Sequence, residues 1–345
     1  MKALVKYASG EGNVDIRDVE EPRCGDDQVK LEIAYCGICG TDIHVLHDRF
    51  RNYPPVILGH EFSGTVVEVG RNVNHHTAVG ERVAGLGATA VTCGQCQYCL
   101  SGYFIFCSNR RGMGHGVNGA FTRYVVMRPD QLYRIPENFS LDEAAMSEPF
   151  AAVVQAVTEI TNVRIGDTAL VSGPGPMGLL CLKLLVAEGV RTIVAGVPGD
   201  TERLKVALHI GAAAVVNIGE VSLNDAVQEH TSGVGVDVAF ECAGHPRSVR
   251  GCLESLRPMG RYTQVAICGQ DIQFPIDLVF YKQLTMAGSV CYTARTWERM
   301  MKIYAEGRVR LNDLISTKLP LSDWQSAFRL CDEKKAIKVL MYPEK

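Results

Sequence analysis

Four cysteines lie close together in one short stretch of the chain. They follow the spacing Cys-x2-Cys-x2-Cys-x7-Cys, at Cys93, Cys96, Cys99 and Cys107. Four thiolates at such short separations can surround one tetrahedral zinc ion and leave no coordination position open. In a reducing compartment, closely spaced cysteines are more often metal ligands than disulfides. The pattern therefore predicts a structural zinc site, which stabilises its loop and need not take part in chemistry.

A second group of metal-binding residue types is dispersed along the chain. Cys39 lies in the stretch Cys-Gly-Ile-Cys-Gly-Thr-Asp-Ile-His, His60 and Glu61 follow a glycine, and Glu148 lies in Ser-Glu-Pro. Thiolate, imidazole and carboxylate groups all bind zinc. By residue type alone, however, a lone cysteine is more often a small core residue, and a glutamate before proline is more often a surface or capping residue. These residues are suggestive of a second metal site and no more.

A glycine-rich turn points to a phosphate-bearing cofactor. The pattern Gly-x-Gly-x-x-Gly follows an apolar strand-like stretch, residues 168–172, and opens a helical stretch that ends at Gly189. Glycines permit a tight turn and a close approach of the backbone to a pyrophosphate, and the helix N-terminus offers free N–H groups. The alternative is a corner whose glycines serve packing only. We expect the turn to bind a dinucleotide through Gly173, Gly175, Pro176, Met177 and Gly178.

The sequence indicates the residues that would bind the ribose of that cofactor less clearly. Dinucleotide sites usually carry an acidic residue about 20 residues beyond the glycines. Pro198 occupies that place, and Asp200 lies two residues later. Asp200 either reaches the ribose hydroxyls or only caps the helix that begins at Thr201. Arg203, beside a 2′-phosphate, would favour NADP. We predict NAD, with NADP as the alternative.

The elements that must position these residues change in kind along the chain. The first third carries strand-like, turn-rich stretches at residues 29–33, 64–69 and 82–86. From about Asp167, strands alternate with helices, which predicts βαβ units and a parallel sheet. The strands there are expected at 168–172, 192–197, 236–241 and 261–267, with a helix over 201–210.

In the last part of the chain the alternation of strands and helices ends. Beyond about Gly288 the pattern predicts helices at 296–306 and 324–333 and a closing strand at 338–341. We therefore predict an α/β dinucleotide-binding domain, residues 152–287. It is inserted into a mainly β catalytic domain formed by residues 1–151 and 288–345.

Composition excludes several classes of partner. The 345 residues suggest about two domains, and the net charge of −3 comes without a block of basic residues. A nucleic-acid or membrane partner therefore has no electrostatic support. We find no apolar run of membrane-spanning length and no signal-peptide pattern at the N-terminus. We expect a cytoplasmic protein.

Taken in their order along the chain, these motifs resemble those of the zinc-containing medium-chain dehydrogenases, in the branch of the sorbitol (polyol) and threonine dehydrogenases. The resemblance covers essentially the whole chain. It implies a doubly wound Rossmann domain inserted into a GroES-like catalytic domain, two zinc ions per chain, and a homo-oligomer, either a tetramer or a dimer.

The resemblance also implies roles for individual residues. Cys39 and His60 bind a catalytic zinc ion, and Glu61 and Glu148 bind it directly or through water. Asp42 is similar to the carboxylate that orients the zinc-bound histidine. Thr41 and His44 match a proton relay, which removes the alcohol proton while hydride passes to the nicotinamide.

Two departures from the family pattern bear on the substrate. Sorbitol dehydrogenases carry an Arg-Tyr pair where this chain has Cys291 and Tyr292; the tyrosine corresponds as a substrate contact, and the arginine is absent. The loop of residues 45–55 also differs. Its Arg49 and Arg51 either bind a phosphorylated or carboxylated substrate or are solvated surface residues.

The sequence thus predicts an NAD(P)-dependent zinc dehydrogenase that acts on a secondary alcohol of a polyol or sugar-like substrate. One alternative is an amino-alcohol dehydrogenase of the threonine 3-dehydrogenase type. Another is a redox-inactive structural member of the family. Loss of zinc ligands would mark the latter, whereas this chain retains all of them.

Overall fold

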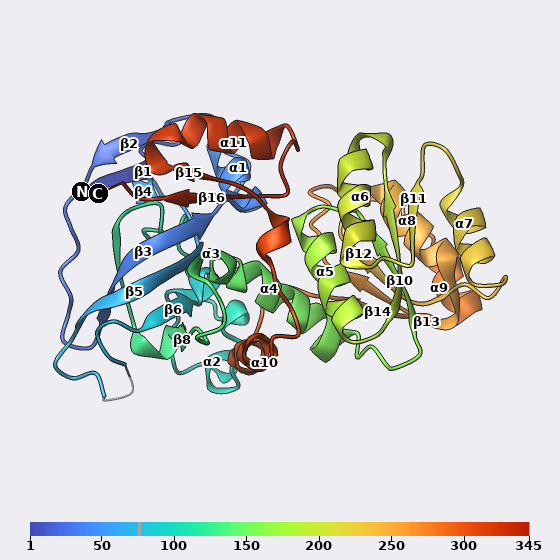
Figure 1. Cartoon of the computed structure of the whole chain (residues 1–345), viewed down its shortest axis with the longest axis horizontal. Coiled ribbons are helices and arrows are strands. Elements are labelled where there is room, and N and C mark those ends of the chain that lie inside the picture. The colour runs from blue at the N-terminus through green and yellow to red at the C-terminus, as the bar shows by residue number, and fades with distance from the viewer. Residues whose placement is uncertain (75–76, 345) are drawn as a thin grey trace. The chain divides into compact units, whose positions relative to one another are not determined.

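The chain folds into two compact units. The computed structural model describes residues 1–74 and 77–344. The first unit comprises Met1–Pro149 and Tyr292–Lys345, and the second comprises Phe150–Cys291. Both ends of the chain therefore belong to the first unit, whose ribbon runs from blue and green to red in Figure 1. In the part of the chain that is described, no helix has the length and apolarity that crossing a bilayer requires.

Mainly antiparallel strands form the framework of the first unit, with one parallel pair at the edge of its large sheet. A large sheet has the order β15-β16-β3-β5-β6-β8, with β7 also paired to β3, and a small sheet has the order β2-β1-β4. The strands are β1 (Lys2–Lys6), β2 (Val14–Asp18), β3 (Val29–Gly37), β4 (Val56–Ile57), β5 (Glu61–Val69), β6 (Arg82–Gly85), β7 (Tyr124–Met127), β8 (Leu132–Arg134), β15 (Ile315–Pro320) and β16 (Lys338–Tyr342). The helices are α1 (Gly40–Leu46), α2 (Gln97–Leu100), α3 (Leu141–Ala144), α10 (Ala294–Ala305) and α11 (Trp324–Asp332), with α4 (Ser147–Val154) at the boundary between the units.

The last strand of the chain completes this framework. β16 pairs antiparallel with β3, where Leu340 faces Gly37 and Met341 faces Cys36. The core between the strands and α11 is apolar and includes Leu31, Phe62, Phe121, Phe328 and Val339, all at most 2% exposed. The C-terminal segment is therefore an integral part of the unit that carries most of the predicted site residues.

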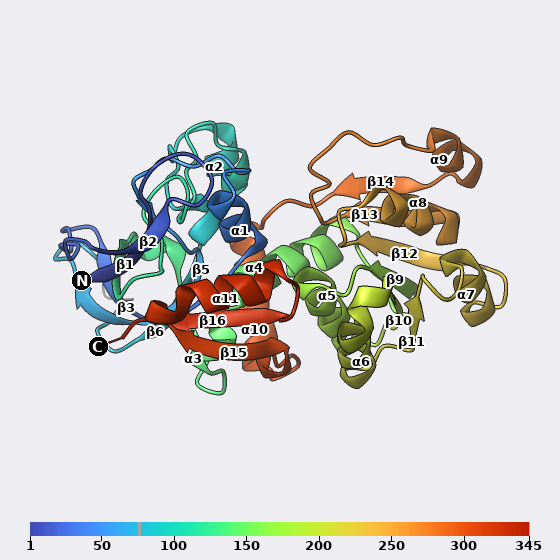
Figure 2. The ribbon, with the colours of Figure 1, turned by 90° about the horizontal axis from the view of Figure 1, so that it is seen from above.

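A six-stranded, all-parallel sheet forms the second unit. Its order is β11-β10-β9-β12-β13-β14. Helices α5 and α6 pack together on one face, while α7, α8 and α9 form a second layer (Figures 1 and 2). The elements are β9 (Thr168–Ser172), α5 (Pro176–Ala187), β10 (Arg191–Gly196), α6 (Thr201–Ile210), β11 (Ala214–Asn217), α7 (Leu223–His230), β12 (Val236–Glu241), α8 (Pro246–Ser255), β13 (Leu256–Gln264), α9 (Ile276–Lys282) and β14 (Thr285–Gly288).

The strand order of the second unit reverses at β9. The chain runs outward from β9 to β10 and β11 and then returns to β12 on the other side of β9. In open α/β sheets, ligands bind beside the carboxyl ends of the strands at such a reversal. The glycine-rich turn follows β9 directly, so it lies at this point.

Several elements have the bounds that the sequence predicts, namely 168–172, 201–210 and 236–241. The strand predicted at 261–267 is different, because β13 begins at Leu256 and ends at Gln264. The amides of Val265 and Ala266 both donate to the carbonyl of Glu241, so the chain turns toward β12 instead of continuing the strand.

Candidate metal centres and cofactor turn

The carboxylate of Asp42 joins two segments that are distant in the sequence. One of its oxygens accepts a hydrogen bond from the backbone N–H of Cys39 (2.9 Å), at the start of α1. The other accepts from the N–H of Gly59 (3.2 Å). Asp42 is 1% exposed, and this burial raises its pKa. Through these two bonds, one side chain holds the residues that carry Cys39 and His60 side by side.

Two glycines allow the second segment to approach closely. Gly59 has φ +89°, and a Cβ there would lie 2.8 Å from Sγ of Cys36. A Cβ at Gly87 would lie 2.1 Å from the carbonyl oxygen of His60. A Cβ at Gly59 would displace Cys36 and Phe121, and a Cβ at Gly87 would displace the backbone of His60, so the chain around this histidine depends on both glycines.

Ligand atoms of Cys39, His60 and Glu61 gather at one point. They all lie within 4.8 Å of one another, and His60 and Glu61 are buried. Among the described residues, the Nδ1 atom of His60 has no hydrogen-bond partner, and it lies 3.7 Å from an oxygen of Asp42. A thiol, an imidazole and a carboxylate at this separation form a donor set that suits zinc.

The charges around His60 show why a cation fits there. Burial lowers the pKa of His60, but the charges of Asp42 and Cys39 raise it more, so that the pKa lies well above its ordinary value. The imidazole is therefore surrounded by negative groups in a dry setting. A divalent cation among the same groups would neutralise them.

Lys338 is a site residue that sequence reasoning missed. Its Nζ lies 2.6 Å from Glu61 and donates to the carbonyl of Ile38 at 3.0 Å, and both charged side chains are nearly inaccessible. Burial lowers the pKa of Lys338, but Glu61 and Cys39 outweigh it and raise the pKa. The only sign of this role in the sequence was a lysine among the apolar residues of the closing strand.

Glu148 lies beside the group rather than within it. It is not among the ligand atoms that gather within 4.8 Å. Burial raises the pKa of Glu148 to about 7. The nearby charge of His60 lowers this pKa, and the charge of Glu61 raises it. The hydroxyl of Tyr292 donates to it, and that hydroxyl also accepts from the N–H of Ala88 (3.2 Å). Tyr292 is 2% exposed, so its position is fixed.

The two predicted relay residues lie on α1. The thiol of Cys39 donates to Oγ1 of Thr41 (3.7 Å), so the threonine hydroxyl lies next to the metal-binding group. His44 is exposed, one turn further along the helix. The loop that follows holds Arg49, which lies beside His47, and Arg51, which stacks on Tyr53.

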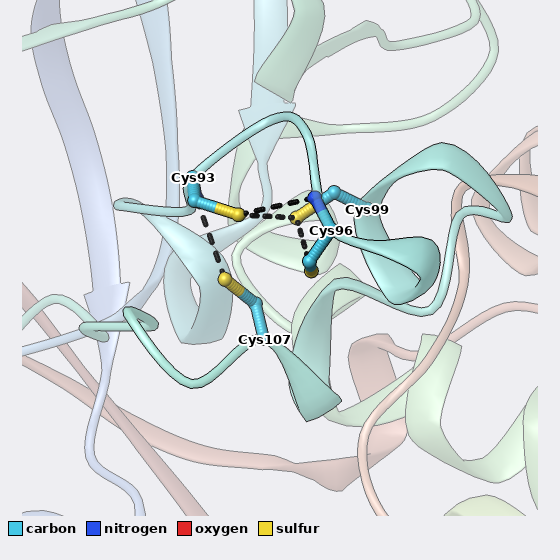
Figure 3. Close-up of side chains that lie close together, drawn as sticks. All are labelled: Cys93, Cys96, Cys99 and Cys107. Carbon is cyan, nitrogen blue, oxygen red and sulfur yellow. Dashed lines mark hydrogen bonds between the residues drawn. The ribbon is translucent and has the colours of Figure 1, made fainter.

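The four cysteines of the lobe point their sulfur atoms toward one centre (Figure 3). The sulfurs lie within 4.8 Å of one another, with Cys96 and Cys99 at 3.5 Å and Cys93 and Cys99 at 3.9 Å. Backbone N–H groups of Gln95 and Cys96 lower the pKa of Cys93 to about 6, whereas burial raises that of Cys99 to about 11. Four converging sulfurs fit a closed zinc site.

The glycine-rich turn combines tight packing with one open position. A Cβ at Gly173 would lie 2.7 Å from the amide of Ala243, and one at Gly178 would lie 2.0 Å from the carbonyl of Gly173. Apart from its chain neighbours, no described residue lies within 4 Å of a Cβ at Gly175, which precedes α5, where Pro176 and Met177 are the first helical residues. Open space beside a helix N-terminus lets a phosphate reach backbone N–H groups.

Asp200 does not cap the following helix, which is one of the two roles that the sequence leaves open for it. It precedes α6, but its side chain makes no capping bond to that helix. It accepts instead from the N–H of Val197 (3.2 Å) and lies 3.6 Å from a guanidinium nitrogen of Arg203. The acid therefore braces the loop after β10 and faces the neighbouring arginine.

Comparisons with known families agree with this architecture. The family model described as the alcohol dehydrogenase GroES-like domain matches residues 25–137, and that of the zinc-binding dehydrogenases matches residues 176–306. A solved structure from Sinorhizobium meliloti 1021, titled as a zinc-binding dehydrogenase bound to NADP, has a TM-score of 0.90 at 28% identity and covers 99% of both chains. The predicted fold class, a Rossmann domain with a GroES-like domain, is confirmed.

Curated relatives match along the full length. A sorbitol dehydrogenase of Halalkalibacterium halodurans is 36% identical and covers 99% of each chain. A D-arabitol-phosphate dehydrogenase of Enterococcus avium is 34% identical, over 99% of this chain and 97% of the relative. An L-threonine 3-dehydrogenase of Xanthomonas euvesicatoria pv. vesicatoria is 33% identical, over 99% of each.

The cysteine lobe gives a direct test of its metal. We expect Cys99→Ser to lower the zinc content from two ions to one per chain and to lower the melting temperature, because a structural zinc contributes folding free energy. Metal analysis and thermal unfolding measure the two effects. Cys24→Ser, which alters a thiol outside both metal-binding groups, serves as the control. An unchanged zinc content in Cys99→Ser would exclude a metal in the lobe.

Proposed function

The chain belongs to the zinc-dependent medium-chain dehydrogenases, in the branch of the sorbitol and threonine dehydrogenases, and we propose that it oxidises a secondary alcohol of a polyol or sugar-like substrate. Its cofactors are zinc and NAD(P). The observation that carries the proposal is the gathering of Cys39, His60 and Glu61 in a buried setting, with Glu148 beside them. The relatives named as polyol dehydrogenases support the substrate class.

Different residues of the chain have different roles in this reaction. Cys39 and His60, with Glu61 and Glu148 directly or through water, would hold the zinc ion, which when bound would supply a Lewis acid that makes the alcohol proton easier to remove, and NAD(P) would accept the hydride. Asp42 orients His60 through its position next to Nδ1. Thr41 lies close enough to Cys39 to take up the alcohol proton, and the exposed His44 passes it to solvent.

Glu148 and Tyr292 form the other side of the site. The hydroxyl of Tyr292 donates to the carboxylate of Glu148 and accepts from Ala88, so neither side chain is free to rotate. The resemblance to sorbitol dehydrogenases assigns a substrate contact to Tyr292, and we propose that role for it.

Activity assays test the substrate class. We expect oxidation of polyols such as sorbitol and arabitol, but not of L-threonine, in a spectrophotometric panel. His60→Ala should lower kcat/KM by about 100-fold or more because it removes a metal ligand. His209→Ala, on the outer surface of α6, is the matched control. Turnover of L-threonine alone would establish the amino-alcohol alternative, and wild-type rates in His60→Ala would overturn the mechanism.

We propose NAD as the preferred cofactor. The carboxylate of Asp200 lies at the loop that follows β10, where it repels a 2′-phosphate, and its proximity to Arg203 offsets the charge of that arginine. We expect Asp200→Ala to shift the ratio of kcat/KM values from NAD toward NADP. Glu202→Ala, in the same turn but paired with Lys205, should leave the ratio unchanged. A wild-type preference for NADP would show this proposal to be wrong.

We propose that the chain forms a homo-oligomer, a dimer or a tetramer. β14 pairs with β13 on one side only among the described residues, and α9 next to it in the chain exposes Ile276, Phe280 and Tyr281 by 64%, 77% and 81%. An edge strand beside a large apolar surface favours coverage by a second copy.

The thirteen free cysteines support a reducing compartment, and we propose the cytoplasm.

Light scattering tests the assembly. We expect a mass that is a multiple of the 37.7 kDa chain. Phe280→Lys combined with Tyr281→Lys should shift the protein toward the monomer, because two charges would be buried unpaired in the interface. Ile165→Lys, at an isolated position that is 98% exposed, should leave the mass unchanged. A wild-type monomer would contradict the proposal.

A further inference from the structure

We infer that the substrate carries a phosphate ester and that the guanidinium groups of Arg51 and Arg111, both of which contact the Tyr53 ring, bind the phosphate. These three residues are called the arginine clamp below. The inference rests on the proposed function, because it concerns the far end of the same polyol or sugar-like substrate.

The clamp places two like charges on one aromatic ring. The guanidinium carbon of Arg51 lies 5.0 Å from the centre of the Tyr53 ring, and that of Arg111 lies 4.6 Å from the same centre. Tyr53 is 37% exposed, and both arginines are exposed. Stacking keeps the two groups in defined positions, and each then presents several N–H donors to the solvent.

No acidic side chain among residues 1–74 and 77–344 forms an ion pair with either arginine of the clamp. Some arginines elsewhere in the chain are neutralised by a neighbour: Arg71, Arg128 and Arg257 each pair with an aspartate. Like charges held together repel each other, so an anion between them is stabilised. In a chain of net charge −3, this accumulation of positive charge is local.

A short segment connects the clamp to the metal-binding group. It begins at Arg111 and reaches Gly114, where a Cβ would lie 2.9 Å from the amide of Gly59, the residue before His60. The carbonyl of His115, in the same turn, accepts from the N–H of Tyr53 (2.9 Å). The clamp and the segment around His60 are therefore neighbours through direct backbone contacts.

The chemistry of the clamp favours phosphate over carboxylate. A carboxylate has two coplanar oxygens, which a single guanidinium can satisfy in a bidentate pair. A phosphate monoester carries three terminal oxygens and a charge of about −2 at neutral pH, so it can accept from two guanidinium groups at once. The relative from Enterococcus avium is named a D-arabitol-phosphate dehydrogenase, which agrees with this class of substrate.

The first experiment compares matched substrates. Initial rates are measured with D-arabitol 1-phosphate and 5-phosphate, with D-arabitol, and with D-arabinonate, which carries a carboxylate instead of the ester. We expect one phosphate ester to exceed free D-arabitol in kcat/KM by about 100-fold, as charge-assisted bonds to two arginines imply. Equal rates with free D-arabitol, or a preference for D-arabinonate, would overturn the inference.

The second experiment removes the clamp. Arg51→Gln and Arg111→Gln should each raise the KM for the phosphate ester by about ten-fold or more and leave the KM for D-arabitol and for the nicotinamide cofactor unchanged. Arg17→Gln is the control, because Arg17 also stacks on a tyrosine, Tyr7, at 3.8 Å, outside the clamp. An unchanged KM for the ester in both clamp variants would overturn the assignment.

A binding measurement separates this inference from the proposed function. Zinc-loaded protein is titrated calorimetrically with the arabitol phosphates and with D-arabitol, without oxidation. If no polyol is oxidised but the ester binds and Arg51→Gln abolishes binding, the clamp is supported and the proposed reaction is wrong. If D-arabitol is oxidised and the esters bind no better than it does, the reaction stands and the clamp is wrong.

Discussion

The geometry of the metal centre depends on one buried carboxylate. The two oxygens of Asp42 hold the amides of Cys39 and Gly59, and the same side chain lies next to Nδ1 of His60. The pairing of β3 with β5 places Gly37 opposite Glu61, and the two bonds of Asp42 then fix the start of α1 beside the segment that carries His60. The cost of burying the charge is offset by the two N–H donors and by the neighbouring imidazole. The ligand positions are therefore set by a residue that donates no ligand itself.

A second buried charge ties the same centre to the end of the chain. Lys338 enters on β16, donates to the carbonyl of Ile38 and pairs with Glu61, while Gly37 lets the carboxylate of Glu61 approach the backbone closely. The first unit is therefore incomplete until its last strand has been added. Further ion pairs, Arg310 with Glu143 and Lys318 with Asp142, also join the two parts of this unit, between which the residues of the parallel sheet are inserted.

The sequence predicted those features whose partners are close along the chain. The cysteine lobe spans residues 93–107 and the glycine-rich turn spans six residues, so spacing alone indicates their geometry. Features that arise from distant pairing were not predictable. The Lys338–Glu61 pair joins residues 277 positions apart, and Arg111 meets Tyr53 only after folding. Asp200 was assigned two roles from its position, but its bond to Val197 depends on the local turn, which spacing does not specify.

The cysteine lobe has a consequence beyond its own stability. Val91 and Arg111 exchange two backbone hydrogen bonds of 3.0 Å at the two ends of the loop that contains the four cysteines. A metal that closes this loop restricts the backbone of Arg111, while the side chain of that residue stacks on Tyr53. A zinc ion bound in the lobe would thereby help to position one half of the proposed arginine clamp. The same segment then continues to Gly114 against Gly59, so a single stretch of backbone links the cysteine lobe, the proposed clamp and the segment that carries His60.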